Sequence, residues 1–232
     1  MLVKYWMSKP AITIDVKAYI KEADELLKKN RIRQLPVVED GKLVGLITDK
    51  DIKRAAPSEV TRLEHITELY DMISNIQISD IMIKNPVTIP LDYPIDKAAS
   101  VLLDKKLSGA PVVDNEGALV GVITQTDIFR VLVSFTGVNK PGVQLAFELE
   151  DRPGSIKEVT DIIRKYNCRM LSIMTTYEFA REGHRFMFLR VRDCDWERLE
   201  QLEEELKATA TLLYVGDDRE VKKVEPARLI IK

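Results

Sequence analysis

The sequence predicts an α+β protein in which two copies of a β-α-β-β-α module precede a ferredoxin-like βαββαβ domain. Three observations lead to this fold class. Residues 33–54 align with residues 108–130 as an internal repeat, which is the primary signal of a duplicated unit. Turn-forming residues crowd 136–142. After that segment, strand and helix patterns alternate in an order that differs from the repeat.

Each copy of the repeat predicts the same succession of elements. Segments 11–14 and 87–89 read as short strands, and an amphipathic helix follows, on which Val16, Ile20, Ala23 and Leu27 share one face. Residues 35–38 and 43–47 predict two strands joined by a hairpin turn at 39–42, and a second helix follows Thr48. One copy is too small to bury an adequate core, so we expect the two to pack sheet against sheet.

The rest of the chain divides into a connector, a third unit and a tail. Residues 143–149, 170–177, 184–191 and 210–215 read as strands, and helices are expected after Ser155 and over 196–207. The expected boundaries are 1–57 and 79–137 for the two copies, 58–78 for a helical connector, 138–216 for the third unit and 217–232 for the tail.

Composition favours an ordinary globular protein of the cytoplasm. The formal net charge is −2, whereas nucleic-acid binders usually carry a basic face, so no nucleic-acid partner is expected. Because no apolar run is long enough to span a bilayer and no signal peptide is visible, no membrane partner is expected either. Cys168 and Cys194 are too few and too far apart for a disulfide framework, so we expect buried free thiols in a reducing compartment.

Catalytic and metal-binding patterns are missing from the sequence. The two histidines, His65 and His184, have no metal-ligand spacing around them, and the motifs of nucleophilic, zinc and P-loop enzymes do not occur. We therefore expect a non-enzymatic protein with no cofactor and no metal.

A Thr-x-x-Asp pair recurs where the last strand of each copy gives way to a helix. Thr48 with Asp51, and Thr124 with Asp127, occupy this corner. The threonine hydroxyl suits a phosphate oxygen, and an aspartate one turn later can accept hydrogen bonds from a ribose diol. The same pair also suits a helix cap, with the threonine at the N-cap and the aspartate in the first turn. Both interpretations remain open at this point.

The repeat resembles the cystathionine-β-synthase (CBS) domain, a family whose tandem pairs hold adenosine ligands in their clefts. The resemblance rests on Gly-Leu-Ile-Thr-Asp-Lys-Asp (45–51) and Gly-Val-Ile-Thr-Gln-Thr-Asp (121–127), each after a Pro-Val-Val strand. It implies an adenine nucleotide, AMP or ATP, as ligand. The implied nucleotide-binding residues are Ile12, Thr13, Arg33, Thr48, Asp51, Val87, Thr88, Ser108, Thr124 and Asp127. Because Ser108 stands where the first copy has the basic Arg33, the two clefts are not expected to be equivalent.

The third unit resembles an ACT domain, a small regulatory fold that binds amino acids. The implied amino-acid site is the loop and helix start made by Asp151, Arg152, Pro153, Gly154, Ser155 and Ile156, although a tight turn without a ligand explains the same residues. The whole chain resembles the CBS–ACT proteins of the acetoin-utilisation B type. This implies a homodimeric regulatory sensor of an adenine nucleotide, acting on a partner or on its own ACT domain. The alternative is an amino-acid sensor in which the CBS pair is a dimerisation scaffold.

Overall fold

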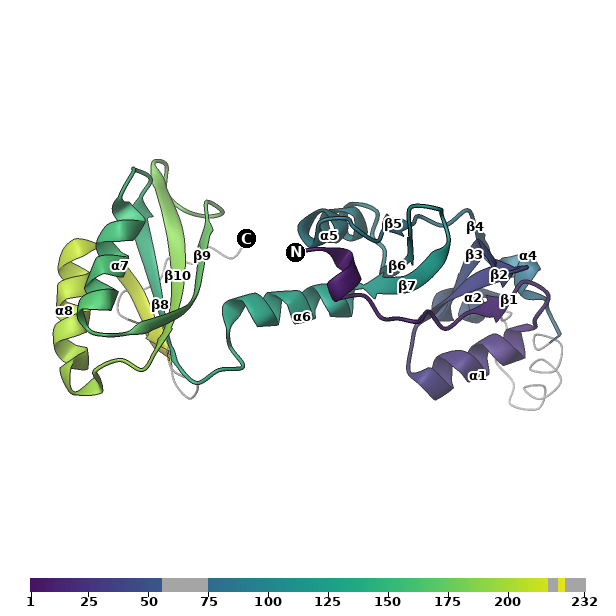
Figure 1. The fold of residues 1–232 in the computed structure, drawn as a ribbon, viewed down its shortest axis with the longest axis horizontal. Coiled ribbons are helices and arrows are strands. Elements are labelled where there is room, and N and C mark those ends of the chain that lie inside the picture. The colour runs from purple at the N-terminus through teal and green to yellow at the C-terminus, as the bar shows by residue number, and fades with distance from the viewer. Residues whose placement is uncertain (56–74, 217–220, 224–232) are drawn as a thin grey trace, which may run out of the picture. The chain divides into compact units, whose positions relative to one another are not determined.

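The computed structural model describes residues 1–55, 75–216 and 221–223. The chain forms two compact units, Met1–Phe129 and Arg130–Lys232, and each is described by itself (Figure 1). Of the expected connector only residues 75–78 are described, and of the expected tail only 221–223. The division between these units falls inside helix α6 (Gln125–Thr136), so the last residues of α6 are grouped with the second unit. There the Ser172 hydroxyl donates to the Thr136 carbonyl over 3.0 Å.

The first copy of the repeat contains the predicted strands and helices. These are β1 (Ile14–Asp15), α1 (Ile20–Asn30), β2 (Gln34–Glu39), β3 (Lys42–Thr48) and α2 (Asp49–Ala55). β1 pairs in parallel with β2, and β2 and β3 form an antiparallel hairpin. Asp40 and Gly41 both have positive φ, as the two central residues of a type I′ turn require. Helix α1 begins four residues later than the Val16 pattern indicated, although Val16 is buried in the same core.

The second copy repeats this arrangement strand for strand. It consists of β5 (Ile89–Pro90), α5 (Ile95–Asp104), β6 (Gly109–Val113), β7 (Leu119–Thr124) and α6. β5 pairs in parallel with β6, and β6 and β7 form a hairpin with the same irregularity at its second valine as the first copy has. The register is also the same, since Gln34 lies opposite Thr48 and Gly109 opposite Thr124.

The segment that precedes each copy packs on the other copy, a contact that the repeat alone does not predict. After the 3-10 turn η1 (Val3–Tyr5), Ser8 pairs with Val122 of β7, and both backbone hydrogen bonds of that bridge are formed. Conversely, α4 (Ile78–Ile81) and β4 (Ile83–Lys84) lie on the first copy, where β4 pairs with β3. Gly45 and Gly121 leave room for Met82 and Met7 respectively, so the exchange is the same in both directions. Neither copy is complete without residues from the other side of the repeat.

The second unit has the predicted βαββαβ order. Its elements are β8 (Val143–Glu150), α7 (Ser155–Lys165), β9 (Arg169–Thr176), β10 (His184–Arg192), η3 (Trp196–Arg198), α8 (Leu199–Thr209), β11 (Thr211–Gly216) and an additional strand, β12 (Val221–Lys223). The sheet is antiparallel with the strand order β12-β11-β8-β10-β9, and α7 and α8 pack against one face of it (Figure 1). Phe147, Met187 and Leu189 are fully buried at the centre of this core.

The expectation of two free thiols is wrong, because Cys168 and Cys194 form a disulfide. Both are buried as expected, each 8% exposed. They meet because β9 and β10 are antiparallel neighbours in which Arg169 pairs with Arg192. Cys168 and Cys194 lie one and two residues beyond that pair, and their Cα atoms are 4.1 Å apart. The argument from unpaired cysteines to a reducing compartment therefore no longer stands.

Candidate functional site

The first Thr–Asp corner is formed by the end of β3 and the first turn of α2. Both the backbone N–H and the hydroxyl of Thr48 donate to Asp51 Oδ2, over 2.9 and 2.6 Å. The Asp51 N–H returns a longer bond of 3.3 Å to Thr48 Oγ1. The two side chains therefore hold each other in one fixed arrangement at the strand-to-helix junction.

The second corner, between β7 and α6, reproduces the first almost to the tenth of an ångström. The N–H and the hydroxyl of Thr124 donate to Asp127 Oδ2 over 2.9 and 2.7 Å, and the Asp127 N–H donates to Thr124 Oγ1 over 3.3 Å. Asp127 is only 3% exposed, whereas Asp51 is half-buried. Helix capping alone would not require a carboxylate to be buried so deeply.

These bonds change the role expected for the threonines. A hydroxyl has a single proton to donate, and in both corners that proton goes to the aspartate. The threonine therefore orients the carboxylate and caps the helix, which agrees with the capping alternative of the sequence. In this conformation it has no proton left for a phosphate, so a nucleotide phosphate would need another donor.

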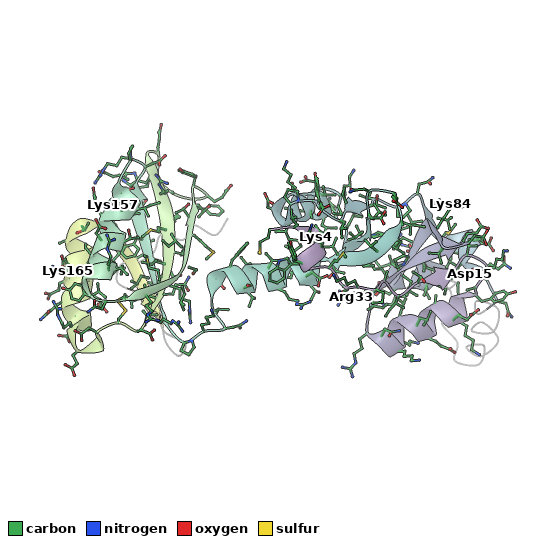
Figure 2. The ribbon with its side chains drawn as sticks, viewed as in Figure 1. Lys4, Asp15, Arg33, Lys84, Lys157 and Lys165 are labelled. Atoms are coloured by element: carbon green, nitrogen blue, oxygen red, sulfur yellow. A yellow bond between two sulfur atoms is a disulfide. The ribbon has the colours of Figure 1, made fainter. Side chains whose placement is uncertain are left out.

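The residues expected beside the corners lie at the same positions in both copies. The Arg33 carbonyl accepts the Asp49 N–H, and the Ser108 carbonyl accepts the Gln125 N–H, both over 3.0 Å. Each of the two residues therefore lies opposite the corner of its own copy, on the neighbouring strand of the hairpin. Both side chains are exposed, and Figure 2 labels Arg33 in the first copy. Ile12 and Thr13 precede β1, and Val87 and Thr88 precede β5, which places them two strands away from the corners on the same sheets.

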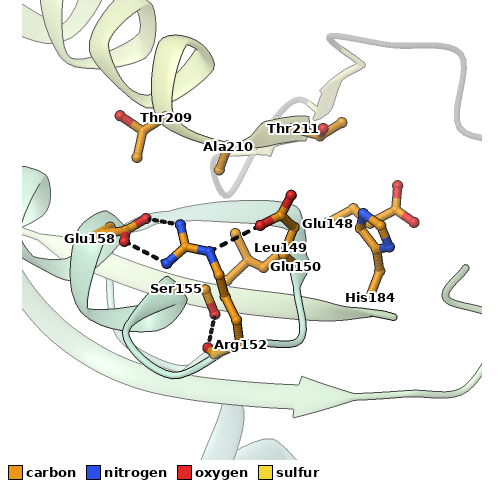
Figure 3. Close-up of a pocket in the computed structure, with 10 residues that line it drawn as sticks. All are labelled: Glu148, Leu149, Glu150, Arg152, Ser155, Glu158, His184, Thr209, Ala210 and Thr211. Atoms are coloured by element: carbon orange, nitrogen blue, oxygen red, sulfur yellow. Dashed lines mark hydrogen bonds and ion pairs between the residues drawn. The ribbon is translucent and has the colours of Figure 1, made fainter. Parts of the chain in front are cut away.

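The loop expected to bind an amino acid is held by ion pairs. Arg152 makes a two-pronged contact with Glu158 on α7, over 2.8 and 2.7 Å, and its Nε donates to Glu150 over 3.0 Å (Figure 3). Asp151 pairs with Arg185 over 2.5 Å. The guanidinium of Arg152 is therefore already occupied by carboxylates of its own chain, and any ligand carboxylate would compete with them.

A cavity of about 250 Å³ adjoins this loop. Of the six residues expected at the amino-acid site only Arg152 and Ser155 line it, while Asp151, Pro153, Gly154 and Ile156 do not. The other lining residues, which sequence reasoning missed, are Glu148, Leu149, Glu150, Glu158, His184, Thr209, Ala210 and Thr211 (Figure 3). They come from β8, α7, β10 and the α8–β11 junction, and only the folded second unit brings these segments together.

Charge pairing lowers the pKa of two glutamates at this cavity. The Arg152 guanidinium lowers the pKa of Glu158, and Arg181, which donates to Glu148 over 2.9 Å, lowers the pKa of that carboxyl. A carboxylate with a depressed pKa stabilises the fold above its ordinary value of 4.5, and this contribution is lost as the pH falls through the lowered value.

We expect Arg152→Gln to lower the unfolding temperature of the second unit at pH 7, with a difference from wild type that shrinks as the pH falls below about 4. The reason is that Glu158 loses its negative charge when it is protonated and then no longer forms an ion pair with Arg152. Circular dichroism melts across this pH range would measure it. A difference that stayed constant in acid would show that Arg152 acts through packing instead of charge.

Comparison with known proteins identifies the repeat. The CBS domain family model matches residues 3–58 and 78–134. A CBS domain-containing protein of Dictyostelium discoideum is 36% identical over 134 residues, which is 57% of this chain and 92% of that protein. The chain belongs to the CBS-domain family. The match covers both copies, including the exchanged segments at their beginnings.

One further relative and one solved structure are similar to this chain over part of its length. L-aspartate semialdehyde sulfurtransferase of Methanocaldococcus jannaschii is 37% identical over 131 residues, but this chain spans only 23% of that enzyme. An acetoin utilization protein of Vibrio cholerae has the same fold over 60% of this chain and 95% of its own, with 19% identity and a TM-score of 0.50. The similarity to the enzyme is therefore confined to a fraction of its length and gives no activity to this chain.

Within residues 1–55, 75–216 and 221–223, no group of three or more His, Cys, Asp or Glu side chains is placed to hold a metal ion. Over the same ranges no helix has the length and apolarity that a membrane span requires.

Proposed function

We propose that the chain is a homodimeric regulatory sensor whose CBS pair binds an adenine nucleotide at the two Thr–Asp corners. The observation that supports this most strongly is the identical placement of Asp51 and Asp127, each held by a threonine through Oδ2 at a strand-to-helix junction. Because each carboxylate is held in one arrangement, a ribose diol that binds there would not have to order it.

The two corners are expected to differ in the ligand they prefer. Arg33 places a cation beside the first corner, whereas Ser108 supplies only a hydroxyl at the equivalent position of the second. A guanidinium favours a phosphate through charge-assisted hydrogen bonds. The first corner therefore suits a ligand with more negative charge than the second.

Helix α6 supplies a route from the second corner to the rest of the chain. Asp127 lies in the first turn of α6, and the same helix continues to Thr136 in the second unit. A nucleotide that prefers one arrangement of the corner would shift the equilibrium of whatever α6 contacts, in proportion to its preference. Such a sensor would act on a partner protein or on its own second unit.

Thermal unfolding in the presence of nucleotides tests the proposal. We expect AMP or ATP at a hundredfold excess over the dissociation constant to stabilise the native chain by about 2.7 kcal/mol, because a ligand that binds only the folded state shifts the equilibrium toward it. GMP is the matched control, since it shares the ribose and phosphate and changes only the base. If no adenine nucleotide raises the unfolding temperature, the proposal is wrong.

An amino-acid sensor is the second candidate, and the cavity beside Arg152 favours it. The second unit has the βαββαβ order of an ACT domain, and a zwitterion in the cavity would exchange ion pairs with the paired Arg152, Glu150 and Glu158. In this case a panel of amino acids, and no nucleotide, would raise the unfolding temperature. The CBS pair would then serve as a dimerisation scaffold.

A further inference from the structure

Gln34 is a buried polar residue at the meeting point of the two CBS copies. It is 6% exposed, and its Nε2 has no hydrogen-bond partner among the residues that the structure describes. A buried amide N–H without a partner keeps the full cost of its removal from water. An unpaired buried donor of this kind therefore gains more than an exposed one from a hydrogen-bond acceptor that reaches it.

The position of Gln34 follows from the duplication. Gln34 begins β2 and Gly109 begins β6, and the alignment of the repeat makes them equivalent residues. A Cβ added to Gly109 would lie 2.4 Å from Gln34 Nε2, so the Gln34 carboxamide fills the space in which a side chain at 109 would stand. Equivalent residues of two related copies face each other here, and one must lack a side chain for the other to fit.

The same geometry places the Gln34 amide next to the second corner. The methyl group of Thr124 lies 3.0 Å from that added Cβ, and the carbonyl oxygen of Ile123 lies 2.8 Å from it. The Gln34 amide is therefore close to both residues. Gln34 itself pairs with Thr48 of the first corner across the hairpin. The unpartnered donor therefore lies between the two corners, close to the one that has no arginine.

We infer that the Gln34 amide determines ligand specificity in the CBS pair by donating a hydrogen bond to the group attached to the ribose of the nucleoside. This inference rests on the function proposed above. Because both threonine hydroxyls donate to their aspartates, a phosphate oxygen that extends from the ribose needs another N–H or O–H. Gln34 supplies a buried N–H without a partner among the described residues, and it is uncharged, which suits a monophosphate or another oxygen-bearing group of low charge.

Gln34→Met tests this inference, since methionine has a similar length and no amide. We expect it to raise the dissociation constant of AMP by about ten- to a hundredfold, the loss that accompanies removal of one hydrogen bond to a charged oxygen. The affinity for adenosine, which lacks the phosphate, stays the same. Gln34→Glu keeps the shape, replaces the donor by a carboxylate and should abolish AMP binding by repulsion. Gln144→Met, in the second unit, is the matched control and leaves both affinities unchanged.

Calorimetric titration of the full-length chain with AMP and with adenosine distinguishes the outcomes. Unchanged AMP affinity in Gln34→Met overturns the inference and leaves the proposed function intact. An equal loss for AMP and adenosine also overturns it, because Gln34 would then act on the packing of the two copies. If wild type binds neither molecule, the proposed function and this inference fail together. A second readout is the melt without ligand, where Gln34→Met should raise the unfolding temperature by about 2–4 °C, since the unpaired amide is removed.

Discussion

The Asp51→Asn, Asp127→Asn double variant is expected to lose adenine-nucleotide binding while it keeps its fold. Each aspartate is held by its threonine through Oδ2, and the ribose would be recognised by the charge on the same carboxylate. Charge-assisted hydrogen bonds are worth about 1.5–3 kcal/mol each, so each corner should lose about ten- to a hundredfold in affinity. Calorimetry with AMP, first on the single variants and then on the double, measures the loss.

Asparagine is the informative replacement because it preserves the cap. Its side-chain carbonyl can still accept the N–H and hydroxyl bonds that Thr124 now gives to Asp127. Alanine would remove the cap as well, at about 0.5–2 kcal/mol, and would mix a loss of stability with a loss of affinity. Circular dichroism of the asparagine variants serves as the check on folding. Wild-type affinity in the folded double variant would show that these corners are caps and nothing more.

Gly121→Ala is expected to destabilise the first unit more than Gly45→Ala does, although the two glycines are equivalent in the repeat. An added Cβ at Gly121 would lie 2.7 Å from the backbone oxygen of Ser8, in the strand bridge that the N-terminal segment forms. At Gly45 the nearest atom, at 2.4 Å, is the sulfur of Met82, and the nearest backbone oxygen is 3.2 Å away. A flexible methionine can move aside, whereas a paired backbone cannot.

Overpacking of this kind costs about 1–3 kcal/mol, and we expect Gly121→Ala at the upper end of that range and Gly45→Ala at the lower end. Urea denaturation of the two single variants measures the difference in the free energy of unfolding. Equal costs, or a neutral Gly121→Ala, would contradict the pairing of the N-terminal segment with β7. The comparison needs no further control, because each glycine is the reference for the other.

The duplicated module could be predicted from the sequence because its signals are local. The alternation of 35–38 and 43–47 around Asp40-Gly41 specifies a hairpin, and the repeat of that pattern at 109–124 specifies a second one. The succession of strands and helices along the second unit could be predicted for the same reason. The residues that specify each strand or helix here lie within that element or a few residues from it.

Features that depend on which segments meet could not be predicted in this way. Met7 aligned with Met82 in the repeat, but the alignment does not say on which copy either segment packs. Cys168 and Cys194 stand 26 residues apart and meet only because β9 and β10 are paired. The ion-pair partners of Arg152 and the acceptor of each threonine hydroxyl proton likewise depend on which residues lie nearby in the folded chain. At the candidate site the residue types were predictable, and their hydrogen bonds were not.

The exchange of N-terminal segments between the two CBS copies also affects how the chain folds during synthesis. Ser8 is synthesised well before its partner Val122, because most of the CBS pair lies between them in the sequence. Until then the segment that contains the fully buried Val3 has nowhere to pack and stays open to chaperones or to a neighbouring nascent chain. Contacts between residues so distant in sequence slow folding, so the packing of the first module is completed only after the second has been made.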